Sequence, residues 1–394
     1  MQFRLSEEQA LIEASVRALL DGEYSFAQRQ RSLDAPHGCR SDLWAQFATM
    51  GWLGLPLPQE LGGLGGGALE TGLLMRAFGR HLVVEPYLPC VLLAARLMAR
   101  LARPEQSAAR LAGVIEGRSR LALAHEESGR RDPWAAAGTS AVKRDGHWNL
   151  RGHKLLARGV AGADRLLVSA TEPAGANGPA RTCVFLLRPD APGLTVHPAR
   201  CADGMQAGDL TLDDVVLADA DLLGGGEDAQ CALHESMAWA LVAMCWEAVG
   251  AMNAMHEATL AHVRQRVQFG RPLIQFQVVE HRVAEMAVCC EESLAVCELA
   301  ALLLDRGDGK ATALASMAKA KVGRAARFVA QQAVQLHGAM GVTEELPVAS
   351  YFRRLTAFTQ QQGSTDWHAQ AYAQGQLGGG AWRNSRTLPA VGAR

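Results

Sequence analysis

The residues best suited to chemistry lie in three short polar segments in the second half of the chain. They are residues 266–277 (RVQFGRPLIQFQ), residues 335–338 (QLHG) and residues 362–364 (QGS). The planar guanidinium of Arg266 suits bidentate contact with phosphate oxygens. A purely structural interpretation is also open for single residues, because a helix C-terminus favours a cation and an isolated Phe269 fits a core.

Several other chemistries are excluded by what the sequence lacks. The nine cysteines include no Cys-x-x-Cys pair, and the histidines do not accompany them at ligand spacing, so no metal site is expected. The glycine-rich residues 61–67 lack the Lys-Ser/Thr of a phosphate-binding loop and are interpreted as a turn. The strand-Gly-x-Gly-x-x-Gly-helix unit of nicotinamide dehydrogenases is not present.

Length and charge indicate a folded, soluble protein of two or three domains. The chain has 394 residues, 49% of them hydrophobic and 20% charged, with a net charge of −1. This balance gives no global field that would attract nucleic acid or an anionic membrane. We identify no signal peptide, and the most apolar window, residues 236–252, is short for a membrane span. Scattered cysteines are typical of reduced thiols, so a cytoplasmic location is expected.

Hydrophobic periodicity divides the chain into three parts that must position the polar segments. Residues 1–120 are predicted to form a helical domain, in which Ser6 precedes an acidic first turn and an apolar stripe. Residues 121–226 alternate short β-rich runs with turns, including the hairpin signal Asp145-Gly146. This part is predicted to form a small antiparallel β domain.

The C-terminal part, residues 227–394, is predicted to form a four-helix bundle. Helices are expected over residues 232–266, 276–306 and 310–338, because Ala, Leu, Met and Glu dominate them and short Gly or Pro turns join them. Residues 378–394 begin with three glycines and are expected to fray. The predicted fold class is therefore mainly α, with a small β domain between two helical parts.

This order of parts, together with several motifs, resembles the acyl-CoA dehydrogenase family of flavoproteins. The likeness extends over nearly the whole chain, from residues 5–9 (LSEEQ) through residues 51–56 (GWLGLP) and 60–63 (ELGG) to the three polar segments. The resemblance implies FAD as cofactor, an acyl-CoA thioester as substrate and an electron-transfer flavoprotein as electron acceptor.

The resemblance also assigns roles to the polar segments. In this family FAD lies between the β domain and the helical domain of one subunit, and a neighbouring subunit grips its diphosphate and adenine. By similarity, Arg266 pairs with the diphosphate, and Ser364 corresponds to a hydroxyl that bonds the cofactor. The full set of implied cofactor-binding residues is Arg266, Gln268, Phe269, Gln335, His337, Gly338 and Ser364.

The segments that face the flavin ring match the family less well. The usual Thr-Glu-Pro-x-Ala-Gly-Ser-Asp appears as residues 125–132 (HEESGRRD), in which only Glu126 and Asp132 hold. The usual Trp-Ile-Thr is replaced by residues 156–158 (LAR), although Gly152 and Lys154 before it remain. The signal for FAD is therefore strong at the diphosphate and weak at the ring.

The catalytic base of the family is missing from both of its usual positions. The family reaction removes the α-proton of a thioester, which is a weak acid, and it needs a positioned carboxylate. One position, just before the late glycine, holds Gln362, and the other, about thirty residues before Gly270, holds Ala240 followed by Leu241. A neutral amide cannot accept a proton at physiological pH, and the other two side chains carry no polar group.

Three hypotheses remain open. The preferred one is a subunit of a heteromeric acyl-CoA dehydrogenase, similar to the small-subunit type of pimeloyl-CoA and steroid degradation, with a homologous partner that carries the glutamate. The second is an autonomous homo-oligomer with a displaced base, for which the candidates are Glu247, Glu235, Asp366 and His368. For Glu247 an ion-paired structural role is expected instead, because buried acids are usually paired. The third is a non-enzymatic binding protein, although the balanced charge disfavours DNA.

Overall fold

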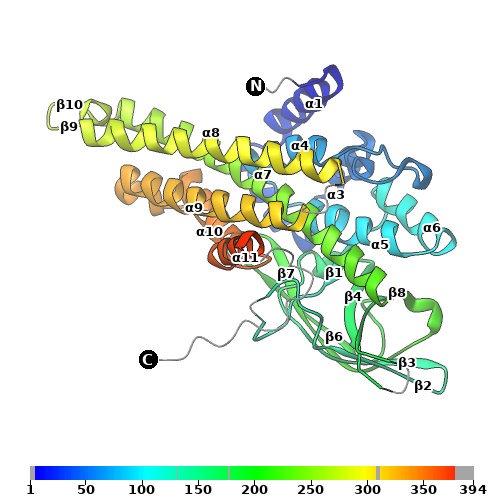
Figure 1. Cartoon of the computed structure of the whole chain (residues 1–394). Helices are drawn as coiled ribbons and strands as arrows, with labels where there is room; N and C mark the ends of the chain where they lie inside the picture. Colours follow the sequence, from blue (N-terminus) through cyan, green and yellow to red (C-terminus); the bar gives the residue numbers. More distant parts are fainter. Residues whose placement is uncertain (1–4, 131, 176–177, 308–310, 378–394) are drawn as a thin grey trace.

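The chain forms a helical part, a β-sheet and a second helical part, in that order along the sequence (Figure 1). The computed structural model describes residues 5–377 except residues 131, 176–177 and 308–310. The predicted fold class, mainly α with a β domain between two helical parts, is confirmed. The tail expected to fray, residues 378–394, lies outside the described residues.

Two helices of the N-terminal part are capped by side chains, one by a neighbour in the sequence and the other by a residue more than two hundred positions away. α1 (Glu7–Glu23) starts with a capping box, in which the side chains of Ser6 and Gln9 each accept from the other's backbone N–H. α4 (Ala68–His81) follows the glycine-rich loop. Asp305, which belongs to the C-terminal helical part, accepts a hydrogen bond from the Ala68 N–H at 2.6 Å. The other helices of six residues or more in this part are α2 (Phe26–Asp34), α3 (Ser41–Thr49), the π-helix η4 (Leu88–Ala95), α5 (Arg96–Leu101) and α6 (Pro104–Ile115).

The central part is one eight-stranded sheet with the order β6-β7-β3-β2-β4-β5-β8 and β1 beside β4. Its pairs are antiparallel except for β1 with β4 and a short pairing of β2 with β4, so the predicted antiparallel sheet has a parallel corner. Asp145-Gly146 does join β2 to β3, with both residues at positive φ as a type I′ hairpin requires. The strands are β1 (Leu121–Ala124), β2 (Ser140–Arg144), β3 (His147–Lys154), β4 (Arg165–Glu172), β5 (Arg181–Leu187), β6 (Leu194–Arg200), β7 (Gln206–Leu217) and β8 (Leu222–Gly225).

Long helices dominate the C-terminal part, and Figure 1 shows α8 and α9 running alongside α7. They are α7 (Glu227–Gln265), α8 (Gln277–Asp305) and α9 (Ala311–His337), followed by α10 (Pro347–Phe358) and α11 (Thr365–Leu377). α7 is long and apolar enough to cross a membrane by length and composition alone. However, 83% of its most apolar window is buried inside the protein, as in the core helix of a bundle.

α4 and α7 cross with their backbones in direct contact. A Cβ atom at Gly79 would overlap the backbone carbonyl of Glu247, and a Cβ atom at Gly250 would overlap the carbonyl of Arg76. Only glycine therefore fits at the two positions where the helices meet. This crossing fixes the depth at which α7 lies in the protein, and with it the position of the residues that α7 carries.

Candidate functional site

The first polar segment forms an exposed hairpin at the end of the bundle. Arg266 follows the last residue of α7, and β9 (Val267–Gln268) pairs with β10 (Arg271–Pro272). Phe269 in the turn between them is 91% exposed and has a φ of 52°. Figure 1 shows the hairpin projecting from the far end of α7 and α8. A large aromatic side chain held outward in a strained backbone conformation is typical of a contact made outside its own chain.

The second polar segment lies at the same end of the bundle. His337, the last residue of α9, stacks on His262 of α7 with ring centroids 4.4 Å apart, and His262 lies about one turn before Arg266. Burial lowers the pKa of both histidines. Gln335 is exposed, and Gly338 follows with a φ of 61°. The sequence interpretation missed His262, although its helical spacing to Arg266 was a usable signal.

Ser364 lies apart from the other residues expected to bind the cofactor. Its Oγ accepts a hydrogen bond from the Trp367 N–H at 3.1 Å and so caps α11. The adjoining Thr365 packs directly on Gly323 of α9. Gly323 precedes Gln335 by twelve residues, about 18 Å along an α-helix. The structure therefore does not bring Ser364 and Gln335 of one chain together.

Gln362, at the first base position, is buried in the loop between α10 and α11. It has a φ of 50° and is 8% exposed. Its backbone carbonyl accepts from His368 Nε2 at 2.8 Å, whereas its side-chain Oε1 finds no hydrogen-bond donor within the described residues. A buried amide oxygen without a donor is costly, and it is free to bond a ligand. It still cannot take up a proton.

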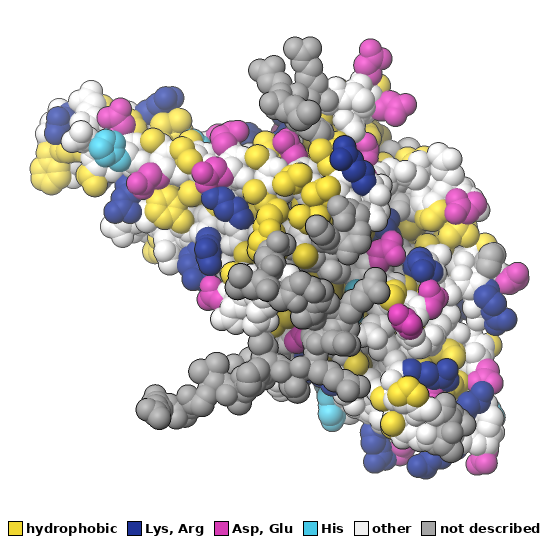
Figure 2. Space-filling view, viewed as in Figure 1, with side chains coloured by type: hydrophobic (Ala, Val, Ile, Leu, Met, Phe, Trp, Pro, Cys, Tyr) yellow, Lys and Arg dark blue, Asp and Glu magenta, His cyan; other side chains and the backbone are white. Residues whose placement is uncertain are grey.

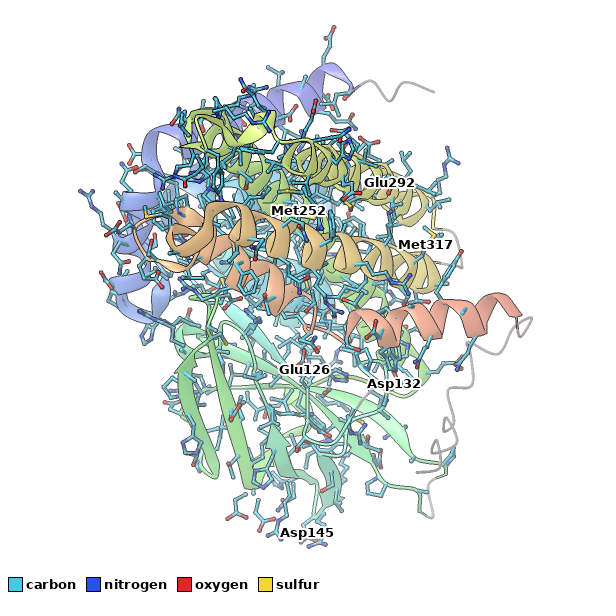
Figure 3. All side chains as sticks on the ribbon, turned by 90° about the vertical axis from the view of Figure 1, so that its left-hand side faces the viewer. Glu126, Asp132, Asp145, Met252, Glu292 and Met317 are labelled. Carbon is cyan, nitrogen blue, oxygen red and sulfur yellow. The ribbon has the colours of Figure 1, made fainter. Side chains whose placement is uncertain are left out.

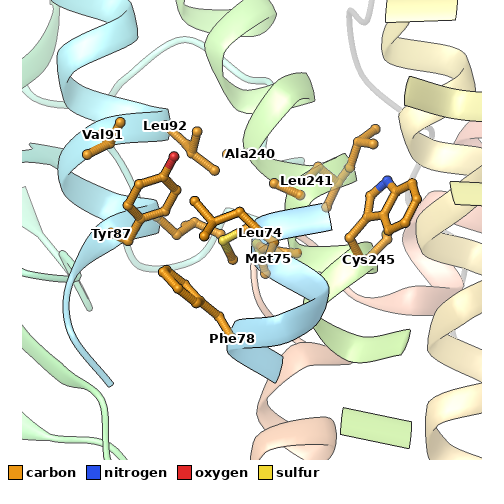
Figure 4. Packing of buried hydrophobic residues seen from close by; sticks show 14 of the residues in the cluster. Leu74, Met75, Phe78, Tyr87, Val91, Leu92, Ala240, Leu241 and Cys245 are labelled. Carbon is orange, nitrogen blue, oxygen red and sulfur yellow. The ribbon is translucent and has the colours of Figure 1, made fainter. Parts of the chain in front are cut away.

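Ala240 and Leu241, at the second base position, are core residues of α7. Both are fully buried, and Figure 4 shows them beside Leu74 and Met75 of α4. No polar atom of either side chain is available, so the second position supplies no base.

Glu247 is the ion-paired structural acid that was expected over a displaced base. Its Oε1 pairs with Arg354 Nη1 of α10. Arg354 also donates to the carbonyl of Val83 at 3.1 Å, and its Nε lies 3.8 Å from Asp203 Oδ2. Burial raises the pKa of Glu247, and the positive charge of Arg354 opposes that rise. The carboxylate is therefore committed to a partner within the chain.

The remaining candidate bases are also placed in structural roles or on the surface. Glu235 lies 3.8 Å from Arg100 on an exposed face, and Asp366 is exposed in the first turn of α11. His368 is fully buried, and its Nδ1 lies 2.9 Å from Ser316 Oγ. Burial lowers the pKa of His368 to about 4, so the ring is neutral near pH 7.

Glu126 is the carboxyl that the structure brings to Gln362. Figure 3 shows it where the sheet meets the helices, and it remains exposed. The surrounding protein displaces water from the Glu126 carboxyl, and this desolvation raises its pKa. Arg158, the Gln362 backbone N–H and Lys319 oppose this rise. The sequence marked Glu126 as a retained flavin-face residue but gave no sign that it neighbours the base position.

Two family models match the sequence. The acyl-CoA dehydrogenase N-terminal domain matches residues 6–118, and the acyl-CoA dehydrogenase C-terminal domain matches residues 231–377. Among relatives, the acyl-CoA dehydrogenase FadE12 of Mycobacterium tuberculosis (strain ATCC 25618 / H37Rv) is 30% identical over 80% of this chain and 82% of that protein.

Solved structures share the whole fold. The Tcur3481-Tcur3483 steroid ACAD G363A variant is 28% identical, with a TM-score of 0.85 over 95% of this chain and 99% of that chain. The ChsE4-ChsE5 complex from Mycobacterium tuberculosis is 24% identical, with a TM-score of 0.85 over 96% and 99%. The FAD complex of PigA is 22% identical, with a TM-score of 0.86 over the same shares. This chain belongs to the acyl-CoA dehydrogenase family.

Proposed function

We propose that this chain is an FAD-binding subunit of a heteromeric acyl-CoA dehydrogenase and lacks a catalytic base of its own. A homologous partner chain supplies the catalytic glutamate. One observation carries the proposal: Gln362 and Ala240 occupy the two positions at which the family places its carboxylate, and neither accepts a proton.

The chemistry explains why this deficiency requires a partner. The α-proton of a thioester is weakly acidic, so its removal needs a positioned carboxylate and hydrogen bonds to the thioester carbonyl. Bound FAD would supply the acceptor for the β-hydrogen, which leaves the substrate as a hydride. The Gln362 amide can hold a neighbouring polar group, but the proton must pass to a carboxylate elsewhere. We propose an electron-transfer flavoprotein as the final acceptor and the cytoplasm as the location.

The residues at the end of the bundle fit a share in binding FAD. Arg266 offers its guanidinium fork, Gln335 an exposed amide, and Gly338 a backbone approach without a Cβ atom. The distance of Ser364 from this cluster suits an FAD that spans two chains, one of which contributes the cluster and the other the ring site. The FAD complex of PigA, which has the same fold, supports FAD as the cofactor.

The surface of α8 supports a second chain of this fold as the partner. Met286 and Cys297 on its inner face are buried, whereas Val278, Val288 and Leu299 are 65%, 55% and 47% exposed. Figure 2 shows hydrophobic side chains gathered over the bundle. The exposed side of α8 also carries charged residues such as Glu285 and Glu292. Three large apolar side chains exposed among them are typical of a surface that a further chain covers. The ChsE4-ChsE5 complex, whose name gives two different chains, supports a heteromer.

Co-expression tests the proposal directly. The chain is purified alone and with a homologous acyl-CoA dehydrogenase that retains the glutamate, and acyl-CoA-dependent reduction of a dye is measured. We expect turnover only in the complex, and we expect its loss when the partner's glutamate is replaced by glutamine. Full turnover by the chain alone would reject the proposal.

A second candidate function rests on Glu126. Its position beside Gln362 and its raised pKa are what a displaced base would need in an autonomous enzyme. Glu126→Gln separates the two functions. It should abolish turnover of an autonomous enzyme, whereas a complex that uses its partner's glutamate should keep its turnover with this substitution.

A further inference from the structure

A small cavity is lined by close sequence neighbours of both base positions. Its volume is about 30 Å³. Met244, about one turn after Ala240, lines it from α7, and Gln361, immediately before Gln362, lines it from the loop after α10. Leu88, Pro89, Leu355 and Phe358 complete an apolar part of the wall. Its apolar wall and its place beside the base positions suit this space to the tail of an acyl group whose α-carbon lies at either position.

Charged side chains fill that space instead. Arg354 lies between Glu247 and Asp203, and Arg158 Nη1 lies 3.2 Å from Asp203 Oδ2. With its amide turned so that the oxygen faces Arg158, Gln361 accepts from Arg158 Nη1 at 3.1 Å. The side chain of Asp203 is fully buried, and those of Arg354, Glu247 and Arg158 are 6%, 15% and 21% exposed. The charges of these two arginines and two acids balance one another without a ligand. Arg354 Nε is the exception, since it finds no hydrogen-bond acceptor within the described residues.

The network also ties together the three parts of the chain. Arg158 and Asp203 come from the β part, and Glu247 and Arg354 come from the C-terminal helices. Arg29 of α2 donates to the Asp203 carbonyl at 3.3 Å. Burial raises the pKa of Asp203, but Arg354 and Arg158 outweigh it and hold the pKa below its usual value. Opening the cavity would leave at least one buried charge without its partner, which is strongly unfavourable.

We infer that this network replaces the acyl site of the chain, so that the chain accepts no acyl tail of its own. A typical ligand pocket encloses about 300–1,000 Å³, whereas a cavity of this size holds about two water molecules. The number of acyl tails that a complex with the partner would bind rests on the proposed function. The closed cavity is a property of this chain alone.

Titration calorimetry of the purified full-length chain with octanoyl-CoA and with CoA tests the closed cavity. A fully buried octanoyl tail should tighten binding on the order of 10⁴-fold. We expect the two ligands to bind within about twofold of each other, or neither to bind. A preference for octanoyl-CoA of about tenfold or more overturns the inference, whatever the partner does.

Paired substitutions provide the matched control. Glu247→Ala with Arg354→Ala removes charge and volume together, and it should create a preference for octanoyl-CoA of about tenfold or more. Glu247→Leu with Arg354→Met removes the charge but keeps the volume, and it should show no preference. If the alanine pair fails to fold, the natural chain and the Leu/Met pair still decide the question.

The complex supplies the last measurement. One octanoyl-CoA bound per two chains is the expected stoichiometry, and two would overturn the inference. A complex that assembles and binds one octanoyl-CoA but shows no turnover would reject the proposed function while leaving the closed cavity intact.

Discussion

Lys319 should make the stability of the chain depend on pH in a calculable way. It is fully buried in α9, and its Nζ donates to the backbone carbonyls of Phe358 and Gln361, the latter at 3.1 Å. Burial lowers the pKa of Lys319 from 10.5 to about 7. Between these values the unfolded chain keeps a proton that the folded chain has released. The free energy of unfolding therefore rises with pH in this window, by about 1.4 kcal/mol per pH unit.

Lys319→Met removes this titration and leaves the rest of the core nearly unchanged in volume. The variant leaves the Phe358 and Gln361 carbonyls without their donor, but that cost is the same at every pH. Between pH 7 and pH 9 the natural chain should gain about 2 kcal/mol relative to the variant in urea unfolding, because the folded-state lysine is still half protonated at pH 7. Lys143→Met, which removes an exposed lysine, is the matched control and should not reproduce this gain. Equal pH dependence of the natural chain and Lys319→Met would refute the reasoning.

Three further predictions concern function and assembly. Gln362→Glu restores a carboxylate but should not give the lone chain any octanoyl-CoA-dependent dye reduction, because the network of Glu247 and Arg354 still fills the acyl space; measurable turnover would contradict this. Phe269→Ala should weaken retention of FAD by the complex about tenfold, since an aromatic ring that is 91% exposed in the lone chain contributes about 1.5–3 kcal/mol once covered. Flavin release on dilution measures this, and unchanged release would mean that the hairpin makes no such contact. Val288→Lys with Leu299→Lys should block co-purification with the partner without changing the melting temperature of the lone chain, because both side chains are exposed in it. A complex of normal size on size-exclusion chromatography would count against the α8 interface.

Local patterns made most of the fold predictable. The long helices follow from their composition, and Asp145-Gly146 marks its hairpin because only residues that tolerate positive φ fit there. The π-helix η4 and the capping of α4 by Asp305 gave no local signal, since the first departs from regular helical spacing and the second joins distant residues.

The sequence predicted which motifs contribute to the candidate site, but not which side chains pair within it. Residue types alone showed that neither base position holds a carboxylate, because Gln362 and Ala240 occupy them. The partner of Glu247 could not be identified in this way, because Arg354 lies more than a hundred residues further along the chain and Asp203 lies in another part. The stacking of His262 on His337 likewise depends on the packing of α7 against α9. Pairings of this kind are properties of the tertiary structure.

The glycine crossing of α4 and α7 limits how an acyl site could evolve again in this chain. Because Gly79 abuts the carbonyl of Glu247, α7 has no freedom to slide aside and make room for a substrate. A lineage mutating one position at a time would first pass through a form with an unmatched charge in its interior, and such forms are poorly stable. To regain an acyl site, the chain would therefore need several substitutions at once, and such combinations rarely arise together. The proposed division of labour between two chains, once reached, is expected to persist in descendants.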